Sequence, residues 1–175
     1  MFESRTTARR VALTCSAAIV CGTALTWAGP SASAADHGGW IPYRAKPFTD
    51  IGVCAFPVHG DIVQDEEEVR TLQTYPDGTD KLVEFRGALA IRFTGNGHSV
   101  VRSAPGYGWF HYLKDGSVHI RIDGGLNVSV KQGNIGSPPG EYVVDGKFSV
   151  VRTADGNKTI HAAHAKVENL CQTLA

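Results

Sequence analysis

The chain has 175 residues and no net charge, because 17 Lys and Arg side chains balance 17 Asp and Glu side chains. Without a basic excess it has no field that would attract nucleic acid, so that class of partner is excluded. Once the N-terminal segment described next is removed, about 140 residues remain, which suits one domain with one hydrophobic core.

The first 35 residues have the features of a secretory signal peptide. Three arginines precede an apolar run from residue 11 to about residue 28, and Ala32-Ser33-Ala34 fits the small-x-small rule for signal peptidase. We expect cleavage after Ala34 or Ala35 and secretion of the remaining chain, with no stable membrane anchor after cleavage.

This segment has three alternative interpretations. A transmembrane anchor is disfavoured because the apolar run is barely long enough and ends in Gly-Pro and small residues. A lipoprotein signal would need Leu three places before a lipidated cysteine, whereas Ala12 precedes Cys15 and Ala18 precedes Cys21. Arg9-Arg10 leaves twin-arginine export open as an alternative to the general secretory route.

Cleavage would leave 14 basic and 16 acidic side chains, a net charge of −2, and two cysteines, Cys54 and Cys171. Two cysteines in an exported chain are most simply one disulfide. In the chain-entropy model a bond that closes so long a loop contributes about 4–5 kcal/mol. Two unpaired buried thiols are the alternative. Nothing next to either cysteine suggests the His or the lowered pKa that a cysteine nucleophile needs.

Residues 36–50 mix glycine, proline and aromatic residues without a period, which predicts an extended N-terminal arm. Residues 51–175 are expected to form a single β domain, because apolar side chains alternate in twos between turn signals. Gly87, in the middle of the clearest alternating segment (82–94), predicts a bulge or bend. The expected strands lie near residues 52–62, 69–75, 80–94, 99–104, 108–113, 117–123, 126–131, 141–152 and 158–164.

Turn signals separate these strands. Pro76–Gly78, Lys114–Gly116 and Ala154–Gly156 all end in Asp-Gly, which predicts three-residue hairpin loops with a left-handed glycine. Gly95-Asn96-Gly97 predicts a fourth hairpin. The acidic run Asp65–Glu68 is interpreted as a solvated connection or an edge protector rather than as a metal site.

Many short strands with hairpin turns indicate an all-β, antiparallel fold, which we expect to be a β-barrel or a barrel-like sandwich of about 8–9 strands. Closing the sheet would hide its edges, and a disulfide from Cys54 to Cys171 would fasten the two ends of the domain together. The segment 165–174 fits either a strand or a short helix.

A hairpin around the turn at 114–116 brings two histidines together. In the register that best separates apolar from polar side chains, His111 faces His119, and both share a face with Trp109 and Arg121. These four residues are the candidate ligand or metal site, since two opposed imidazoles provide half of a metal site. A polar outer face with two neighbouring imidazoles is the alternative, and no local motif provides further ligands for zinc.

No catalytic signature is present. The sequence has no GxSxG and no recognisable Ser, His and Asp grouping, so no catalytic residue, cofactor or metal is assigned. The prolines of Gly136–Gly140 remove backbone donors, so that loop is not a phosphate loop. Aromatic residues are concentrated in the arm and in one strand, where they suit either a ligand platform or core packing: Trp40, Tyr43, Phe48, Tyr107, Trp109, Phe110 and Tyr112.

Two short motifs carry a resemblance. The segments VCAFPV at 53–58 and NLCQTLA at 169–175 make the chain similar to small secreted β-proteins of actinobacteria, which have an early Cys followed by Phe-Pro and a second Cys before a Leu-Ala tail. The resemblance implies an all-β fold and a disulfide between Cys54 and Cys171, and it implies no activity. The aromatic arm and the histidine hairpin depart from the usual pattern.

Three functions are consistent with these features. The first is a secreted, disulfide-linked binding module for a small apolar ligand or an extracellular protein. The second is a barrel-type enzyme, such as a cyclase-like isomerase, and the third is a structural or inhibitory envelope protein without a cavity. An apolar cavity would favour the first two, and a titratable group pointing into it would favour the enzyme.

Overall fold

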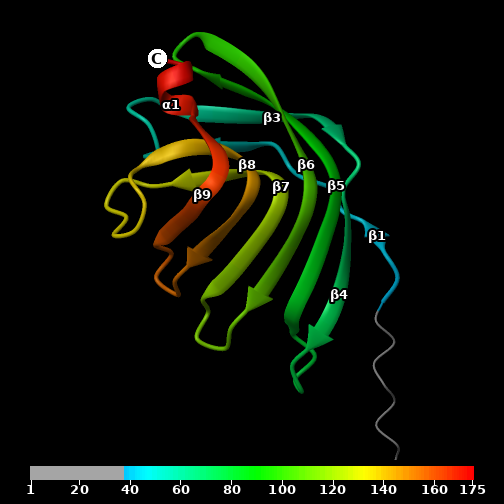
Figure 1. Cartoon of the computed structure of the whole chain (residues 1–175). Coiled ribbons are helices and arrows are strands. Elements are labelled where there is room, and N and C mark those ends of the chain that lie inside the picture. The colour runs from blue at the N-terminus through cyan, green and yellow to red at the C-terminus, as the bar shows by residue number, and fades with distance from the viewer. Residues whose placement is uncertain (1–37) are drawn as a thin grey trace, which may run out of the picture. The chain divides into compact units, whose positions relative to one another are not determined.

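The structure is a computed structural model that describes residues 38–175, and Figure 1 shows the arrangement of these residues. The segment interpreted as a signal peptide lies outside the described residues. Nine strands and one short helix follow one another: β1 (Ile41–Pro42), β2 (Phe48–Asp50), β3 (Val58–Asp65), β4 (Glu68–Thr74), β5 (Asp80–Gly95), β6 (His98–Tyr112), β7 (Val118–Val130), β8 (Gly140–Arg152), β9 (Lys158–Asn169) and α1 (Leu170–Thr173). The described chain is therefore all-β, as the alternating sequence pattern predicts.

All neighbouring strands are antiparallel and belong to one sheet with the order β1-β4-β5-β6-β7-β8-β9. Strand β5 is long enough to pair with two strands along the same edge. Its first part pairs with β4, and its last part pairs with β3, which in turn pairs with β2. The sheet therefore divides near Gly87, where neither β3 nor β4 pairs with β5.

The expectation of a closed barrel is wrong, because β9 pairs with β8 and with no other strand among residues 38–175. The two ends of the domain meet through a covalent bond instead of a hydrogen-bonded ladder. Cys54, just before β3, forms a disulfide with Cys171 of α1, with the two Cα atoms 5.3 Å apart.

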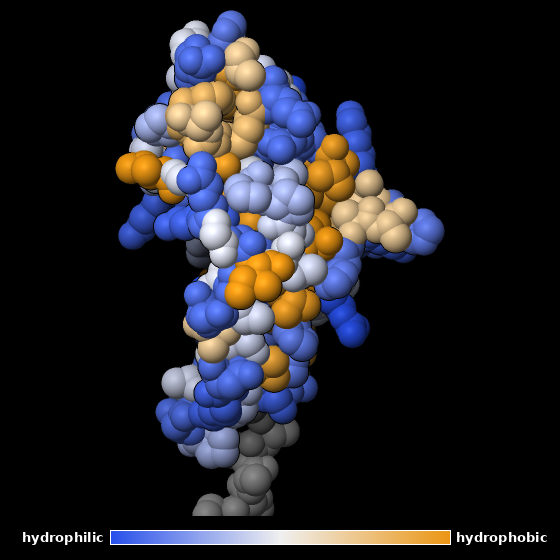
Figure 2. Space-filling view, turned by 90° about the vertical axis from the view of Figure 1, so that its left-hand side faces the viewer, coloured by the Kyte–Doolittle hydropathy of each residue, from blue (hydrophilic) through white to orange (hydrophobic). Residues whose placement is uncertain are grey.

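The other edge of β9 has no strand partner among residues 38–175. Figure 2 views the side of the molecule on which β9 lies in Figure 1, where apolar residues occur in separate groups between hydrophilic ones. Polar side chains along an open edge discourage pairing with other chains.

A row of glycines crosses the sheet. Gly87, Gly106, Gly124 and Gly146 lie opposite one another on β5, β6, β7 and β8. Three of them have φ between +123° and +130°, a conformation that other residues rarely adopt. Glycine kinks of this kind allow strands to bend without ending. The four strands curve strongly in Figure 1.

This row explains where the predicted strand boundaries are wrong. Segments 99–104 and 108–113 form one continuous strand, β6, and segments 117–123 and 126–131 form β7. Gly106, Gly124 and Gly125, which lie between the expected strands, pair within the sheet instead. The first expected strand also begins later, at Val58. The ambiguous last segment is both strand and helix, since β9 continues to Asn169 and one helical turn follows.

The three Asp-Gly turns have the predicted form. Around Lys114–Gly116, the Leu113 amide donates to the carbonyl of Ser117 at 2.9 Å, and the Gly116 amide donates to the carbonyl of Leu113 at 3.0 Å. Gly116 has φ +86°, and the other two turns repeat the same bonds. The hairpin register that places His111 opposite His119 is confirmed.

Two groups of apolar side chains form the core. One joins the disulfide region and α1 to the last part of β5, and its buried members are Val53, Cys54, Val58, Leu89, Ile91, Phe93, Val143, Leu170 and Leu174. The other lies within the bend of β7 and β8, and its buried members are Ile122, Val128, Val130, Tyr142, Val144, Phe148 and Val150. No helix in residues 38–175 has the length and apolar character needed to cross a membrane.

Candidate functional site

The sheet has two chemically different faces. We call inner the face that carries Phe110, Ile120 and Val150, which lie opposite one another on β6, β7 and β8 and belong to or pack on the second core group. The outer face carries the neighbouring residues, including His111 and His119. Successive side chains of a strand alternate between faces, so the two sets are separated by the thickness of the sheet.

The N-terminal arm lies across the inner face and forms one wall of a half-open cavity of about 360 Å³, here called the arm cavity. Its lining includes aromatic and aliphatic side chains from the arm, β5, β6 and β7, among them Tyr43, Phe48, Phe85, Phe110, Tyr112 and Leu126. The rings of Tyr43 and Phe85 meet edge to face with centroids 5.2 Å apart. The ring centroids of Phe85 and Phe110 are 4.8 Å apart. The contact between Tyr43 and Phe85 fixes the arm to the sheet.

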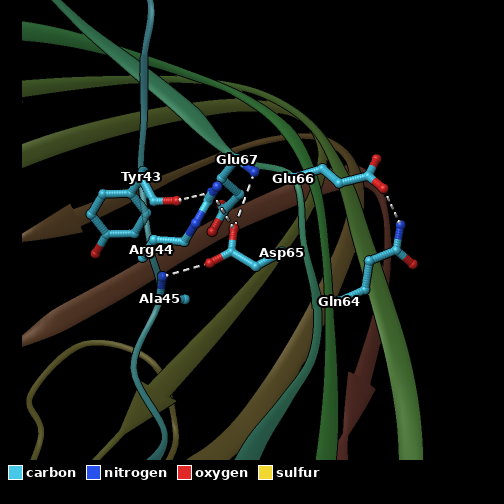
Figure 3. Close-up of polar contacts among 7 residues, drawn as sticks. All are labelled: Tyr43, Arg44, Ala45, Gln64, Asp65, Glu66 and Glu67. Atoms are coloured by element: carbon cyan, nitrogen blue, oxygen red, sulfur yellow. Dashed lines mark hydrogen bonds and ion pairs between the residues drawn. The ribbon is translucent and has the colours of Figure 1, made fainter.

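Asp65 holds the arm in this place, as Figure 3 shows. Its carboxylate accepts hydrogen bonds from the Ala45 amide at 2.8 Å and from the Glu67 amide at 3.1 Å. The Tyr43 amide also donates to the carbonyl of Glu67 at 2.9 Å. The Asp65 side chain is only 10% exposed. The acidic run is therefore not simply a solvated connection, because its first member is a structural acceptor.

Glu67 brings a titratable group to the arm cavity, which it lines. Burial raises the pKa of its carboxyl above the usual value, and the neighbouring Asp65 carboxylate raises it further. Both effects disfavour the charged form. A carboxyl of this kind beside aromatic walls suits the exchange of a proton with a bound molecule.

A second cavity of about 300 Å³, here called the sheet cavity, continues along the inner face. The two cavities share Phe110, Tyr112, Leu126 and Asn127 in their linings, so together they form one groove. Aliphatic and aromatic side chains make up most of the sheet cavity, with Arg152, Lys158 and Asn127 as its polar members. The groove therefore combines a mainly apolar wall with a few polar groups, the usual composition of a small-molecule site.

Glu141 is a buried carboxyl on β8, opposite Ser129 of β7. It is 0% exposed, and neither carboxyl oxygen has a hydrogen-bond partner within the described part of the chain. Burial raises its pKa to about 7, and the Asp50 carboxylate adds to the shift. Asp50 itself accepts a hydrogen bond from the Ser129 hydroxyl at 2.5 Å. This acid lies in neither cavity's lining, so we assign it no role in the groove.

The residues singled out from the sequence do lie together, but on the outer face. Trp109, His111, His119 and Arg121 line a hollow of about 490 Å³ with Leu82. The described residues contain no group of three or more His, Cys, Asp or Glu side chains placed to hold a metal ion. The hollow offers two imidazoles, one guanidinium and one indole, and its role as a ligand site stays a prediction.

The aromatic residues of the arm divide between the faces. Trp40 lies under two guanidinium groups, with Arg70 at 4.5 Å and Arg86 at 4.1 Å from its ring centroid, and it meets Tyr107 edge to face. Tyr43 lines the arm cavity instead. β1, between these two residues, pairs with the edge strand β4. The arm thus wraps around the sheet edge, and its rings do not form one platform.

Sequence reasoning missed most of the groove, in particular Glu67, Leu126, Asn127, Arg152 and Lys158. One signal was present for the last two. Arg152 and Lys158 flank the turn at 154–156, and the register argument applied to the histidine hairpin would have placed them opposite each other, as the structure does. No local pattern marks Leu126, because its place in the groove depends on the bend at Gly124.

Comparison with known proteins gives no identification: the chain matches no protein-family model, no curated protein and no solved structure. The similarity to secreted actinobacterial β-proteins stays a prediction.

Proposed function

We propose that the protein is a secreted, disulfide-linked binding module that holds a small apolar molecule in the groove formed by the arm cavity and the sheet cavity. The observation that carries this proposal is the apolar wall shared by two adjoining cavities of about 360 and 300 Å³. Each lies within the range of about 300–1,000 Å³ that small-molecule sites occupy.

The partial exposure of apolar side chains on the inner face supports a binding role over a purely structural role. Phe110, Ile120 and Leu126 point toward the interior of the bend, yet each is only half-buried. A packed core would cover such side chains, because burying apolar surface contributes about 25 cal/mol per Å². A bound apolar molecule would complete that burial, whereas an envelope protein without a cavity has no need of the groove.

Secretion is supported by two independent features. The N-terminal segment has the charge, apolar run and small residues of a signal peptide. The disulfide between Cys54 and Cys171 is of a kind that persists outside the reducing cytosol.

A filled-groove variant tests the proposal. The mature chain, with its disulfide intact, would be titrated with N-phenyl-1-naphthylamine, a neutral apolar molecule that fluoresces when bound. Leu126→Trp places a larger side chain in the groove, and Leu82→Trp is the matched control in the outer hollow. We expect the wild type and the control to bind alike, and Leu126→Trp to bind about tenfold more weakly or not at all.

Two results would overturn the proposal: no binding to the wild type, or equal binding to the wild type and to Leu126→Trp. Native mass spectrometry of the protein purified from culture medium gives a second measurement. A reproducible excess mass that disappears on denaturation would support a bound molecule.

A second candidate, an enzyme that transfers a proton to or from an apolar substrate, is favoured by Glu67. Its carboxyl lines the arm cavity with a pKa raised by burial. Mass spectrometry of the small molecules that co-purify with the wild type and with Glu67→Gln would separate the two functions. Different molecules in the two samples would indicate conversion of a substrate. Identical molecules would indicate binding alone.

A further inference from the structure

Two cations stand at one end of the sheet cavity. Arg152 is the last residue of β8, Lys158 is the first residue of β9, and the two lie directly opposite each other across the hairpin. Both line the sheet cavity. Val118 pairs with Arg152 from the other side and also lines the cavity, so the cationic end and the apolar wall belong to one site.

Like charges placed directly opposite on neighbouring strands destabilise a sheet. Within residues 38–175, neither Arg152 nor Lys158 has a carboxylate oxygen within 4.0 Å. The Lys158 ammonium donates instead to the backbone carbonyl of Ser129 at 2.7 Å. Burial lowers the pKa of Lys158, although Asp50 and Glu141 oppose that change. The chain thus holds a partly desolvated ammonium beside a guanidinium, with no paired carboxylate on either.

Arg152 and Lys158 also border a neighbouring hollow that contains Asp50 and Asp155, but the sheet cavity itself has no acidic lining residue. Its other lining residues are aliphatic or aromatic, apart from the neutral amide of Asn127. Along the whole groove, Glu67 in the arm cavity is the one acidic lining residue. Charge complementarity at this end therefore favours a ligand with one anionic group and an apolar body.

We propose that the molecule bound in the groove is an apolar carboxylic acid, with its carboxylate held between Arg152 and Lys158. Its apolar part lies against Phe110, Ile120 and Leu126. This inference rests on the proposed function and adds the chemical class of the ligand. A guanidinium presents a fork of donors that matches a carboxylate, and an ammonium adds a point charge. The ligand carboxylate would also remove the repulsion between the two cations.

Two probes of equal chain length test the inference, dodecanoic acid and dodecan-1-ol, each titrated near neutral pH by displacement of N-phenyl-1-naphthylamine. We expect the acid to bind the wild type about tenfold more tightly than the alcohol. Arg152→Gln and Lys158→Gln should each weaken binding of the acid by about fivefold or more and leave binding of the alcohol unchanged. Arg92→Gln and Lys166→Gln, at exposed positions outside both cavities, are the matched controls and should leave both affinities unchanged.

Charge reversal adds a result that loss of folding could not imitate. Arg152→Glu should lower the affinity for dodecanoate and raise the affinity for dodecylamine, whose ammonium group has the opposite charge. Thermal unfolding of the ligand-free variants would check the fold. Arg152→Gln should not unfold at a lower temperature than the wild type, because it removes a like-charge pair. Lys158→Gln removes that pair and also the hydrogen bond from the Lys158 ammonium to the Ser129 carbonyl, so its unfolding temperature serves to show that it is folded at the temperature of the titration.

The outcomes separate the two proposals. Equal affinity of the wild type for acid and alcohol, or an unchanged acid affinity in both glutamine variants, would overturn the carboxylic acid and leave the apolar site standing. Failure of the acid, the alcohol and the fluorescent probe to bind would overturn both.

Discussion

The bend of the sheet leads to a specific prediction for the substitution Gly124→Ala. A Cβ added there would lie 2.3 Å from the carbonyl oxygen of Pro105 and 2.6 Å from the Cα of Gly106. Both are backbone atoms of the neighbouring strand, so no side-chain rotation can relieve the overlap. Gly124 also has φ +128°, which an alanine rarely adopts. Gly124→Ala should therefore force β6 and β7 apart at the bend.

Two other glycines separate the two contributions to the loss of stability, which are the backbone conformation and the steric overlap. Gly133 has φ +82° and nothing within 4 Å of an added Cβ, so Gly133→Ala carries only the left-handed penalty of about 1–2 kcal/mol. Gly146 has φ +123°, close to that of Gly124, but its nearest neighbour, the Ala165 Cα, lies at 3.1 Å. Gly146→Ala should cost about 1–3 kcal/mol for its backbone conformation, and a little more for that contact.

Gly124→Ala adds to the same backbone cost an overlap that only movement of a strand removes, and we expect a loss above about 4 kcal/mol. The total stability of a domain is about 5–15 kcal/mol, so this variant lies near the limit of folding. Urea unfolding of the oxidised proteins, followed by far-ultraviolet circular dichroism, would give the free energies of unfolding.

The expected order of destabilisation is Gly133→Ala, Gly146→Ala and Gly124→Ala, from least to greatest. A Gly124 variant no less stable than the Gly133 variant would refute the close approach of the strands at the glycine row. If Gly124→Ala is recovered only unfolded, comparison of the Gly146 and Gly133 variants still decides whether the row carries strain.

Two further predictions concern the disulfide and the buried acid. Replacing both cysteines, Cys54→Ser with Cys171→Ser, frees residues 117 apart in sequence and should lower the free energy of unfolding by about 4–5 kcal/mol; an unchanged urea midpoint would contradict this. Glu141 has a folded-state pKa of about 7 against an ordinary value of 4.5, so the folded protein binds this proton more tightly than the unfolded chain does. Stability should accordingly fall as the pH rises from about 4.5 through 7, while Glu141→Gln should remove this component and unfold at a higher temperature than the wild type above pH 7. Calorimetry of the wild type and of Glu141→Gln across that pH range measures how the stability of each depends on pH. The same pH dependence in both proteins would count against an uncharged Glu141.

Part of the site was predictable because hairpins are local. The Lys-Asp-Gly turn sets the pairing of the strands on either side of it, and with that register the outer-face group of Trp109, His111, His119 and Arg121 follows. The same logic applies to Arg152 and Lys158 across the Ala-Asp-Gly turn. The turn does not reveal the groove on the inner face, because the N-terminal arm and the bend of the sheet form part of the wall of that groove.

The all-β class, the hairpin turns and the pairing of the two cysteines follow from alternation, turn residues and cysteine count, which are properties of short stretches of chain. The open sheet, the bend and the groove do not. A glycine with positive φ serves equally well in a turn or in a kink, and the choice depends on whether a glycine lies opposite it on the next strand. In this chain Gly87, Gly106, Gly124 and Gly146 align only after the strands have paired. Their close approach bends the sheet, and Leu126, which follows the bend, lines the same groove as Phe110. The groove is thus a consequence of contacts between residues distant in sequence.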